Sequence, residues 1–511
     1  MLTKVYGSAI YGVSARTITI EVNVDTGIGY HLVGLADNAI KESNFRISTA
    51  LLNTGFKIPG KKVTINMAPA DLQKVGSAYD LTIAMGILAS SQQIRAESIA
   101  DYIIMGELAL DGIIRPIKGA LPIAVQARDE GFKGFILPKQ NAKEAAVVTG
   151  LEVIGVDNIS EVIDFFNTGK ELEITKIDIH KEFYDQLNSF PFDFADVKGQ
   201  ENVKRALEIA AAGGHNIILI GPPGSGKTML AKRIPSILPP LTLEEALETT
   251  KIHSVAGKLG EVSSLMTVRP YCSPHHTVSD AGLVGGGSYP QPGEISLAHN
   301  GVLFLDELPE FKRTVLEVMR QPLEDREITI SRAKFTVTYP ASFMLVASMN
   351  PSPSGYFPDD PNNTSSLQEM QRYMNRISGP LMDRIDLHIE VSPVPFEDLS
   401  AERNGEKSIE IRKRVEKARN FQTKRYKNIP SIHCNAQIGS KQLDEFCQVD
   451  EAGKSLIKTA MERLNLSARA YDRILRVSRT IADLEGVEML NSTHIAEAIQ
   501  YRSLDREGWG I

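Results

Sequence analysis

Near the middle of the chain stands the octapeptide Gly221-Pro222-Pro223-Gly224-Ser225-Gly226-Lys227-Thr228, which matches the pattern G-x-x-x-x-G-K-[ST]. It follows the apolar run Ile217–Ile220, which predicts a strand, and precedes the amphipathic segment Met229–Ile237, which predicts a helix. Glycines let the backbone wrap closely round an anion, so that successive N–H groups point inward beside the positive end of the following helix. The strand, loop and helix together predict a phosphate-binding site in an α/β fold.

The loop carries the groups that hold a nucleoside triphosphate. The Lys227 ammonium is expected to reach the β- and γ-phosphates, and the Thr228 hydroxyl is expected to ligate Mg²⁺. The predicted nucleotide-binding residues are Gly221, Pro222, Pro223, Gly224, Ser225, Gly226, Lys227, Thr228 and Met229.

Two further apolar runs end in polar residues. The run that begins at Gly301 ends in Asp306 and Glu307, and the run Phe343–Ser348 is followed by Met349 and Asn350. In-line phosphoryl transfer needs a group that holds the metal's coordination shell and a group that orients or deprotonates the attacking water. We assign the first role to Asp306 and the second to Glu307. The Asn350 amide is expected to hydrogen-bond the γ-phosphate or the water, although an Asn-Pro pair also opens turns.

Composition limits the class of protein. The chain has 511 residues, which suggests about three folded units. Its formal net charge of −7 excludes a polycation that coats nucleic acid or anionic lipid. The three cysteines lie far apart and suit a reducing compartment, and no apolar run approaches the roughly 18 residues of a membrane span. We therefore expect a cytoplasmic protein without a membrane partner.

Hydrophobic patterning divides the chain. Thr17–Val24 and Lys62–Met67 alternate apolar and polar residues, which predicts strands with one buried face, and Glu107–Ile114 places Asp-Gly between apolar pairs, which predicts a tight hairpin. We expect an α/β domain over residues 1–170 and a linker over 171–192. A second α/β unit is expected over 193–396, followed by a charged helical region over 397–511.

The order of the motifs resembles that of AAA+ ATPases. The three strand-terminal motifs are followed by Arg384 in Leu381–Asp386 and by Arg469 in the helical segment Leu466–Ala470. Over essentially the whole chain the sequence resembles the magnesium-chelatase-like AAA+ proteins of the ComM/YifB type. The strings that carry this resemblance are Arg269-Pro270-Tyr271, Pro274-His275-His276-Thr277, Gly285-Gly286-Gly287, Ile377-Ser378-Gly379-Pro380-Leu381 and Ala470-Tyr471-Asp472-Arg473-Ile474-Leu475.

The resemblance implies an architecture and an assembly. Residues 1–170 would form a Lon-protease-like (ribosomal-protein-S5-like) α/β domain, residues 193–396 a three-layer AAA+ core with a parallel sheet, and residues 397–511 a helical lid. The family also implies a homo-oligomeric ring, commonly a hexamer, with ATP and Mg²⁺ at subunit interfaces. Arg384 resembles the arginine finger that reaches a neighbour's γ-phosphate, and Arg469 resembles the second sensor. Taken alone, either arginine would be read as a solvated or salt-bridged surface residue.

Two insertions and one basic stretch are candidates for DNA contact. Ser254–Leu297 resembles the loop that interrupts the second AAA+ helix, and Arg326–Val337 resembles the hairpin that precedes the first sensor. In related ring helicases such elements line the pore, so Arg332 and Lys334 become candidate phosphate contacts, with solvated charges as the alternative. Residues 401–430 hold ten Lys/Arg against four Glu, which indicates either a solvated helix face or a contact with the DNA backbone.

The sequence departs from the family at a metal site. Many members carry four cysteines after the sensor asparagine, whereas this chain has Ser352-Pro353-Ser354-Gly355 and no cysteine between Asn350 and Asp383. Hydroxyls are poor substitutes for thiolates, so we expect no zinc. Cys272, Ser273, His275 and His276 form an incomplete ligand set for another metal site, and packing or a loop contact is the preferred interpretation of the two histidines.

A second departure concerns proteolysis. In the alignment with Lon-type proteases the nucleophile position falls on Ala78 and the general-base lysine position falls on Leu121. A Ser–Lys pair needs both side chains within hydrogen-bonding reach, so we predict a protease-like fold without protease activity. Ser77 and Lys118 lie near these positions, and a shifted register would restore the pair.

These observations together predict an ATP-driven ring motor that acts on single-stranded or branched DNA. A helicase or branch-migration factor like the ComM proteins, which aid DNA integration in natural transformation, is the leading hypothesis. A chelatase-like or chaperone-type ATPase that remodels a protein partner is one alternative. Another is a nucleotide-gated assembly switch that binds a protein partner through the N-terminal domain.

Overall fold

The computed structural model describes residues 2–95, 97–186, 190–259, 264–287, 289–332, 335–395, 405–429, 432–464 and 466–502. The chain divides into two compact units. The first comprises Met1–Gln186 with Leu243–Thr267, and the second comprises Leu187–Thr242 with Val268–Ile511.

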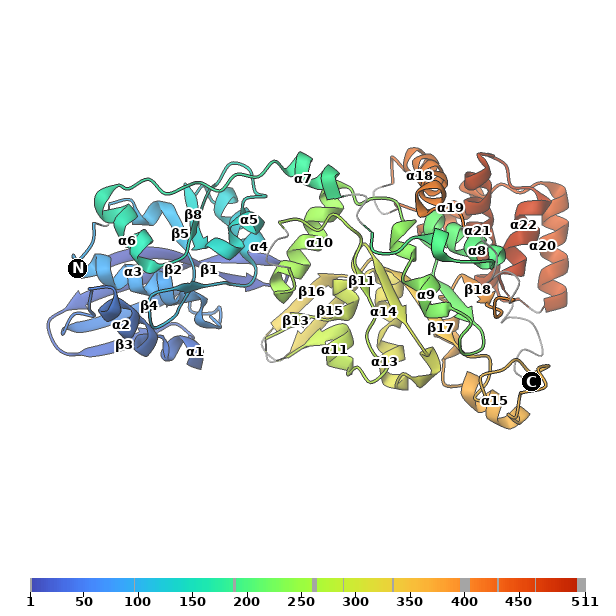
Figure 1. Ribbon diagram of the computed structural model, residues 1–511, viewed down its shortest axis with the longest axis horizontal. Helices are drawn as coiled ribbons and strands as arrows, with labels where there is room; N and C mark the ends of the chain where they lie inside the picture. Colours follow the sequence, from blue (N-terminus) through green and yellow to red (C-terminus); the bar gives the residue numbers. More distant parts are fainter. Residues whose placement is uncertain are drawn as a thin grey trace. The chain divides into compact units, whose positions relative to one another are not determined.

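The first unit is built on a seven-stranded mixed sheet in the order β3-β4-β2-β1-β5-β8-β9 (Figure 1). Its strands are β1 (Leu2–Tyr11), β2 (Ser14–Asp25), β3 (Gly29–Val33), β4 (Lys62–Ala68), β5 (Tyr102–Ile104), β8 (Gly134–Pro138) and β9 (Glu152–Val156). A small antiparallel pair joins β6 (Glu107–Leu108) to β7 (Ile114–Arg115), as the Asp-Gly turn predicts. The helices are α1 (Asn38–Lys41), α2 (Ser43–Asn53), α3 (Asp80–Ser90), α4 (Ala120–Asp129), α5 (Lys139–Ala145), α6 (Ile159–Thr168), α7 (Ile179–Gln186) and α10 (Leu243–Ala256).

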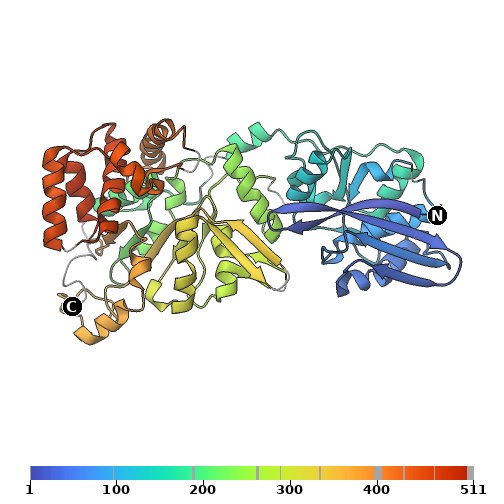
Figure 2. The same ribbon diagram turned by 180° about the vertical axis from the view of Figure 1, so that it is seen from behind.

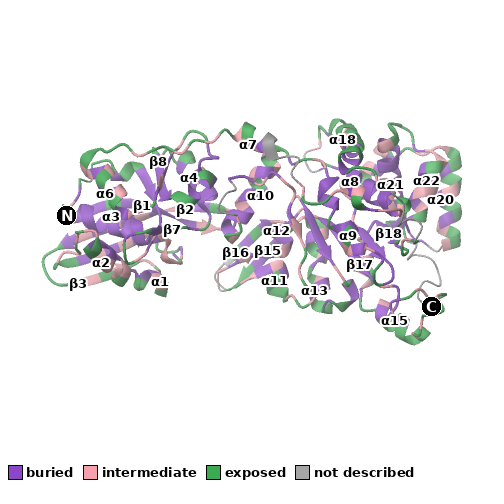
Figure 3. Cartoon of the chain, viewed as in Figure 1, coloured by how far each residue is buried: buried purple, intermediate pink, exposed green. Residues whose placement is uncertain are grey.

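Helix α3 forms the centre of this unit, because all eleven of its residues are buried. It packs against β1 and β2, where a Cβ on Gly86 would lie 2.7 Å from the Val22 side chain, so a glycine is needed for the close approach. Strand β2 alternates buried and less buried residues, as its period-two pattern predicts. Figure 3 shows α3 and the central strands in the colour of buried residues.

Two features of this unit differ from the sequence-based expectations. The region predicted as a linker contains α7, in which Phe183 is buried. Helix α10, expected within the AAA+ core, belongs to the first unit, where it packs on α4. Its Ser254 hydroxyl donates to the Glu144 carboxylate, and its Ser254 carbonyl accepts from the Gly119 N–H at 3.1 Å. These contacts join the C-terminal part of α10 to α4 and α5 of this unit.

The second unit contains a five-stranded parallel sheet in the order β11-β14-β17-β10-β18. Its strands are β10 (Ile217–Ile220), β11 (Tyr271–Cys272), β14 (Val302–Leu305), β17 (Met344–Met349) and β18 (Leu387–Glu390). The central strands β10, β14 and β17 are wholly buried, which explains their continuous apolar sequences. The helices of this part are α8 (Glu201–Gly213), α9 (Lys227–Ala231), α11 (Asp280–Val284), α12 (Glu294–Leu297), α13 (Arg313–Val318), α14 (Arg320–Asp325), α15 (Leu367–Met374) and α16 (Gly379–Met382).

Two hairpins leave this sheet region. They pair β12 (Gly285–Gly286) with β13 (Gln291–Pro292), and β15 (Glu327–Arg332) with β16 (Phe335–Pro340). The second hairpin is the one predicted before the first sensor, and Figure 2 shows its two strands in yellow, side by side. The predicted insert 254–297 is not a single loop, because it begins inside α10 and contributes β11 to the sheet.

A group of helices completes the second unit. They are α18 (Ser408–Arg425), α19 (Ser440–Phe446), α20 (Glu451–Leu464), α21 (Ala468–Glu485) and α22 (Ser492–Gln500). Helix α21 begins at the N-cap Ser467, whose side chain accepts from the Ala470 N–H, and ends at Gly486 in the left-handed region. Its buried face packs on α8, α18 and α22, so the helical region shares a core with the sheet. No helix within the described residues is long and apolar enough to cross a membrane.

Candidate functional site

The octapeptide forms a loop between β10 and α9, as its sequence predicts. Gly221 allows the first turn, because a Cβ there would lie 2.2 Å from the Val391 carbonyl oxygen. The buried Lys227 ammonium donates to the carbonyl oxygens of Gly221 at 2.7 Å and Pro222 at 3.0 Å. Its third contact is the Asn350 Oδ1 atom at 3.3 Å. Burial lowers the pKa of Lys227, although the nearby carboxylates of Asp306 and Glu307 oppose this shift.

The carboxyl ends of β10, β14 and β17 bring the predicted catalytic groups together. The Thr228 hydroxyl donates to Asp306 Oδ2 at 2.8 Å, and the Ser348 hydroxyl donates to Asp306 Oδ1. The Glu307 backbone lies in the left-handed region with φ 54°, and its N–H donates to Ser348 Oγ at 3.3 Å. Thr228, Asp306, Glu307 and Asn350 therefore meet beside the Lys227 ammonium.

A cavity of about 440 Å³ opens beside Glu307 and Asn350. Arg372 and Arg376, near α15, line it together with Glu310, and Arg376 pairs with Glu310 at 2.9 Å. On another side Glu307 Oε2 lies 3.5 Å from His276 Nδ1, and the His276 ring packs on His275 at 4.1 Å between centroids. His276 thus has a contact with the predicted catalytic carboxylate that its sequence position did not suggest.

Two orphaned polar atoms at the loop fit a nucleotide. Gln200 donates from Nε2 to the carbonyl oxygens of Ser225 and Ser392, each at 3.0 Å. Its Oε1 atom and the Ser225 hydroxyl are buried, and neither has a hydrogen-bond partner in the part of the chain that the structure describes. Buried polar atoms normally find partners, so these two are suited to a ligand that supplies them. Sequence reasoning missed Gln200, because a lone Gln before a helix carries no motif.

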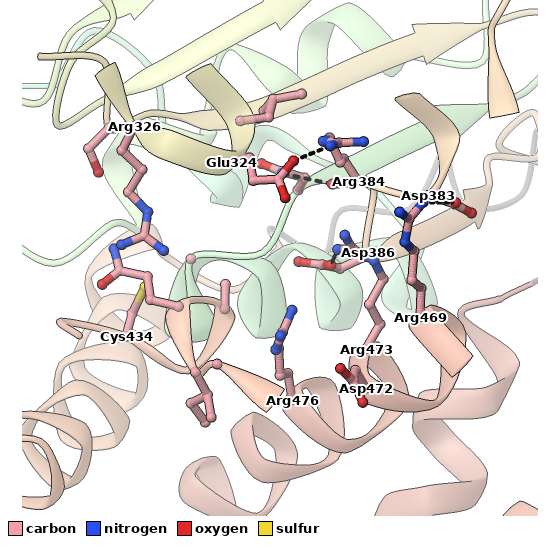
Figure 4. Close-up of a pocket in the computed structure, with 18 of the residues that line it drawn as sticks. Glu324, Arg326, Asp383, Arg384, Asp386, Cys434, Arg469, Asp472, Arg473 and Arg476 are labelled. Carbon is pink, nitrogen blue, oxygen red and sulfur yellow. Dashed lines mark hydrogen bonds and ion pairs between the residues drawn. The ribbon is translucent and has the colours of Figure 1, made fainter. Parts of the chain in front are cut away.

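The two predicted interface arginines lie in a different place. Arg384 and Arg469 both line a pocket of about 430 Å³, which Figure 4 shows with further arginines of α21. Arg384 pairs with Glu324 and donates to the Pro380 carbonyl at 2.6 Å, and Arg469 pairs with Asp383 at 3.0 Å. No residue of the octapeptide lines this pocket among the described residues.

The same pocket holds three more arginines, Arg326, Arg473 and Arg476. Arg473 pairs with Asp386, yet burial and the neighbouring Arg476 and Arg502 lower the pKa of Arg473 to about 9. The Arg476 Nε atom is buried and has no hydrogen-bond partner among the described residues. The pocket lining also carries the carboxylates of Glu324, Asp383, Asp386 and Asp472, and the first three of these pair with Arg384, Arg469 and Arg473.

The two hairpins of the second unit lie against each other. The Tyr339 hydroxyl donates to the Pro290 carbonyl at 2.9 Å, and a Cβ on Gly285 would meet the Ile330 side chain at 2.8 Å. Arg332 is exposed, and its guanidinium lies near Gly286. The structure therefore joins the predicted insert to the predicted hairpin, with Arg332 between them. The other candidate contact, Lys334, lies outside the described residues.

The basic stretch after residue 401 divides into two groups. Arg412, Arg414, Arg419 and Arg425 make contacts within the protein, for example Arg414 with Glu208 and Glu406 and Arg425 with Asp483 at 2.6 Å. The lysines of the stretch that remain exposed are Lys407, Lys413, Lys417, Lys424 and Lys427. Arg403 lies outside the described residues. The local positive charge is therefore partly compensated inside the protein.

The protease-like positions hold no nucleophile and base. Ala78 lies in a short 3₁₀ segment and Leu121 is buried in α4. Ser77 donates to the Glu107 carboxylate, while the Lys118 alkyl chain would lie 2.8 Å from a Cβ on Gly257. No hydrogen bond joins Ser77 to Lys118, both of which are described. The shifted register therefore gains no support from these contacts.

Serines occupy the loop where many family members carry cysteines. Ser352 Oγ donates to the Tyr356 carbonyl at 2.7 Å and lies 2.9 Å from Ser354 Oγ. Ser354 in turn bonds the Asn363 side chain at 2.8 Å. Side-chain hydrogen bonds thus hold this loop together, and the absence of zinc stays a prediction.

Comparisons with known proteins agree with this geometry. Family models match three parts of the chain: "Magnesium chelatase, subunit ChlI" at residues 193–399, "Subunit ChlI of Mg-chelatase" at 20–141 and "Magnesium chelatase, subunit ChlI C-terminal" at 405–502. The chain is 44% identical over 507 residues to the competence protein ComM of Haemophilus influenzae, covering 99% of this chain and 98% of the relative. It is 43% identical over 509 residues to the uncharacterized protein YifB of Escherichia coli, with the same coverage.

A third relative matches one region only. The Lon protease 2 of Bacillus subtilis is 32% identical over 160 residues, which cover 29% of this chain and 28% of the relative. The full-length relatives and the family models confirm the predicted family and fold class, an α/β protein with a parallel AAA+ sheet and a helical C-terminal region. The chain belongs to the magnesium-chelatase-like AAA+ ATPases of the ComM/YifB type.

Proposed function

We propose that this protein is an ATP-driven, ring-forming motor that acts on DNA as a helicase or branch-migration factor. The family implies the use of ATP and Mg²⁺. The proposal rests mainly on one observation: Arg384 lines a pocket that contains no residue of the Lys227 phosphate loop among the described residues. An arginine that does not line its own phosphate site is available to the site of a neighbouring subunit.

Each residue of the phosphate site takes one role in hydrolysis. Lys227 would bind the β- and γ-phosphates, and Thr228 and Asp306, whose side chains are joined by a hydrogen bond of 2.8 Å, would hold the metal ion. Bound Mg²⁺ offsets the negative charge of the phosphates. Glu307 orients the attacking water and takes its proton, and Asn350, already 3.3 Å from the Lys227 ammonium, fixes the γ-phosphate or the water.

Arg384 and Arg469 act together in trans. Both line one pocket, and Asp383, which pairs with Arg469, directly precedes Arg384 in the chain. Head-to-tail contacts that close on themselves produce a ring, in which each pocket faces the next subunit's nucleotide. An arginine in this role contributes about 10³–10⁵ to the rate. A hexamer is the proposed assembly.

A mixing experiment tests this shared site. Arg384→Ala removes the arginine from one face and Lys227→Ala disables the phosphate site, so each variant alone should hydrolyse ATP very slowly. Random mixing of equal amounts gives an intact phosphate site facing an intact arginine at about one quarter of the interfaces, so hydrolysis should return. Arg128→Ala, which breaks an exposed pair with Asp129, is the matched arginine control and should hydrolyse at the wild-type rate. A mixture as inactive as its components would contradict the trans role.

The DNA contact is proposed at the paired hairpins. Arg332 is exposed where the β15–β16 hairpin meets the glycine-rich β12–β13 hairpin, and an exposed arginine on a protruding hairpin suits the phosphate backbone of a strand. The name of the relative, competence protein ComM, supports an association with competence, and within it we propose a role in the integration of DNA during natural transformation.

Branch migration measures this function. The wild-type protein with ATP should convert a labelled four-way junction into two duplexes, and Glu307→Gln should bind the junction without converting it. Arg332→Ala should lower the conversion rate while DNA-free ATP hydrolysis stays unchanged, and Arg128→Ala should leave both unchanged. A junction that the wild-type protein neither binds nor converts would favour a motor that remodels a protein partner.

A further inference from the structure

Asn216 joins three segments at the edge of the sheet opposite the nucleotide site. Its side-chain Nδ2 donates to the Arg384 carbonyl at 2.9 Å, and its Oδ1 accepts from the Leu345 N–H at 2.8 Å. Its backbone carbonyl accepts from the N–H groups of Asp386 at 2.9 Å and Leu387 at 3.1 Å. Four hydrogen bonds therefore fix the segment that carries Arg384 to the start of β10 and to β17.

The strands that Asn216 connects also carry the phosphate site. Strand β10 begins at the next residue and runs four residues to the loop at Gly221, and β17 leads to Asn350. Strand β10 runs parallel to β17 and β18, and the five residue steps from Asn216 to Gly221 span about 16 Å. Strand β10 therefore leads to the chain's own phosphate loop at one end, and at its other end it adjoins Asn216, which holds the Arg384 segment.

His215 extends the same support to the lid. It is fully buried, and its Nδ1 lies 3.0 Å from Asp386 Oδ2 while its Nε2 lies 2.8 Å from Thr480 Oγ1. Burial lowers the pKa of His215 to about 3, with the nearby Arg419, Arg476 and Arg473 acting in the same direction, so the ring is neutral at pH 7. The second oxygen of Asp386 accepts from Arg473, one helical turn after Arg469 on α21. The Arg384 segment and the Arg469 helix are therefore anchored to the same dipeptide.

We infer that Asn216 is a positioning residue that sets Arg384 for the active site of the neighbouring subunit. The inference rests on the proposed trans role of Arg384. An amide suits this position because one side-chain atom must donate to a carbonyl while the other accepts from an N–H. An aspartate keeps the acceptor for Leu345 but places a carboxylate oxygen against the Arg384 carbonyl, which pushes the two apart.

The variant Asn216→Asp tests this inference. A displacement of about 1 Å in a catalytic group costs on the order of 10²-fold, so kcat for ATP hydrolysis should fall about 10- to 100-fold. The KM for ATP should stay within about twofold, because the chain's own phosphate loop is unaltered. Asn53→Asp is the matched control, since the Asn53 amide also donates to a carbonyl, that of Leu110 at 2.7 Å, in the first unit. It should leave both constants unchanged.

An experiment that mixes two variants distinguishes a misplaced Arg384, which affects the neighbouring subunit, from damage to the variant's own phosphate site. A mixture of Asn216→Asp and Lys227→Ala should regain hydrolysis. In this mixture the correctly placed Arg384 of a Lys227→Ala chain can reach the intact phosphate site of an Asn216→Asp chain. Asn216→Ala, which adds no charge, repeats the test if the aspartate prevents folding. Recovery with Arg384→Ala but none with either Asn216 variant would overturn the inference and leave the trans role of Arg384 intact. Loss of recovery with Arg384→Ala itself would overturn the proposed function.

Discussion

Asp483 is the centre of a buried charge cluster whose disruption should destabilise the lid. Its carboxylate accepts from Arg425 at 2.6 and 2.8 Å, from Asn435 at 2.8 Å and from Arg479 at 3.2 Å, and its side chain is 1% exposed. Asp483→Asn leaves the two guanidinium groups without a counter-charge in a buried site. Breaking a buried ion pair in this way costs about 3–5 kcal/mol. The free energy of unfolding of the lid should fall by that amount.

Urea denaturation followed by far-ultraviolet circular dichroism measures this loss. With a slope of about 1–3 kcal/mol per molar urea, the midpoint of the lid transition should fall by at least about 1 M. Hydrogen exchange should rise in α18 and α21, which carry Arg425 and Arg479, and stay unchanged in the first unit. Glu451→Gln is the matched control, because Glu451 pairs with Lys454 at the surface, where the two side chains are 90% and 61% exposed, and should shift the midpoint little. Equal midpoints for the two variants would refute the reasoning.

Three further predictions concern the phosphate site, the water site and the DNA contact. Lys227→Ala should lose ATP binding, because the buried ammonium supplies the charge that faces the phosphates. Titration calorimetry measures this loss, and binding at wild-type affinity would contradict the role of Lys227. Glu307→Gln should bind ATP with nearly unchanged affinity but hydrolyse it at least about 10²-fold more slowly. The assembled ring should therefore accumulate in sedimentation experiments. Full turnover by this variant would remove Glu307 from the mechanism. Arg332→Ala should weaken DNA binding in fluorescence anisotropy and reduce the slope of log affinity against log salt by about one, whereas an unaltered slope would place the contact elsewhere.

The proximity of most candidate phosphate-site residues was predictable from sequence, because they come in order at the ends of apolar strands. In a parallel sheet the carboxyl ends share one edge, so Thr228, Asp306 and Asn350 meet there without further information. Gln200 and His276 were not predictable as site residues, since their contacts depend on how distant segments pack. The same holds for Asn216, whose two partner segments, around Leu345 and Arg384, are separated from it by more than a hundred residues.

Helix α10 and the basic stretch show two other limits of sequence reasoning. The sequence of α10 does not indicate which unit buries it, and the structure places it on α4. The composition of the stretch after residue 401 does not distinguish arginines that face solvent from arginines that pair with a carboxylate. Arg414 and Arg425 meet Glu208 and Asp483, which lie far away in the sequence, and so the local excess of charge overstated the exposed basic surface.

The measurement that tests the central claim most directly is the ATPase rate without DNA and with single strands, duplex or a four-way junction, with Lys227→Ala as the blank. We predict that DNA stimulates hydrolysis and that the stimulation falls steeply as salt rises, because phosphate contacts are made at the expense of bound counterions. Arg332→Ala should lower the stimulated rate and leave the DNA-free rate unchanged. A rate indifferent to every form of DNA would contradict a DNA motor and favour a protein-remodelling ATPase or an assembly switch.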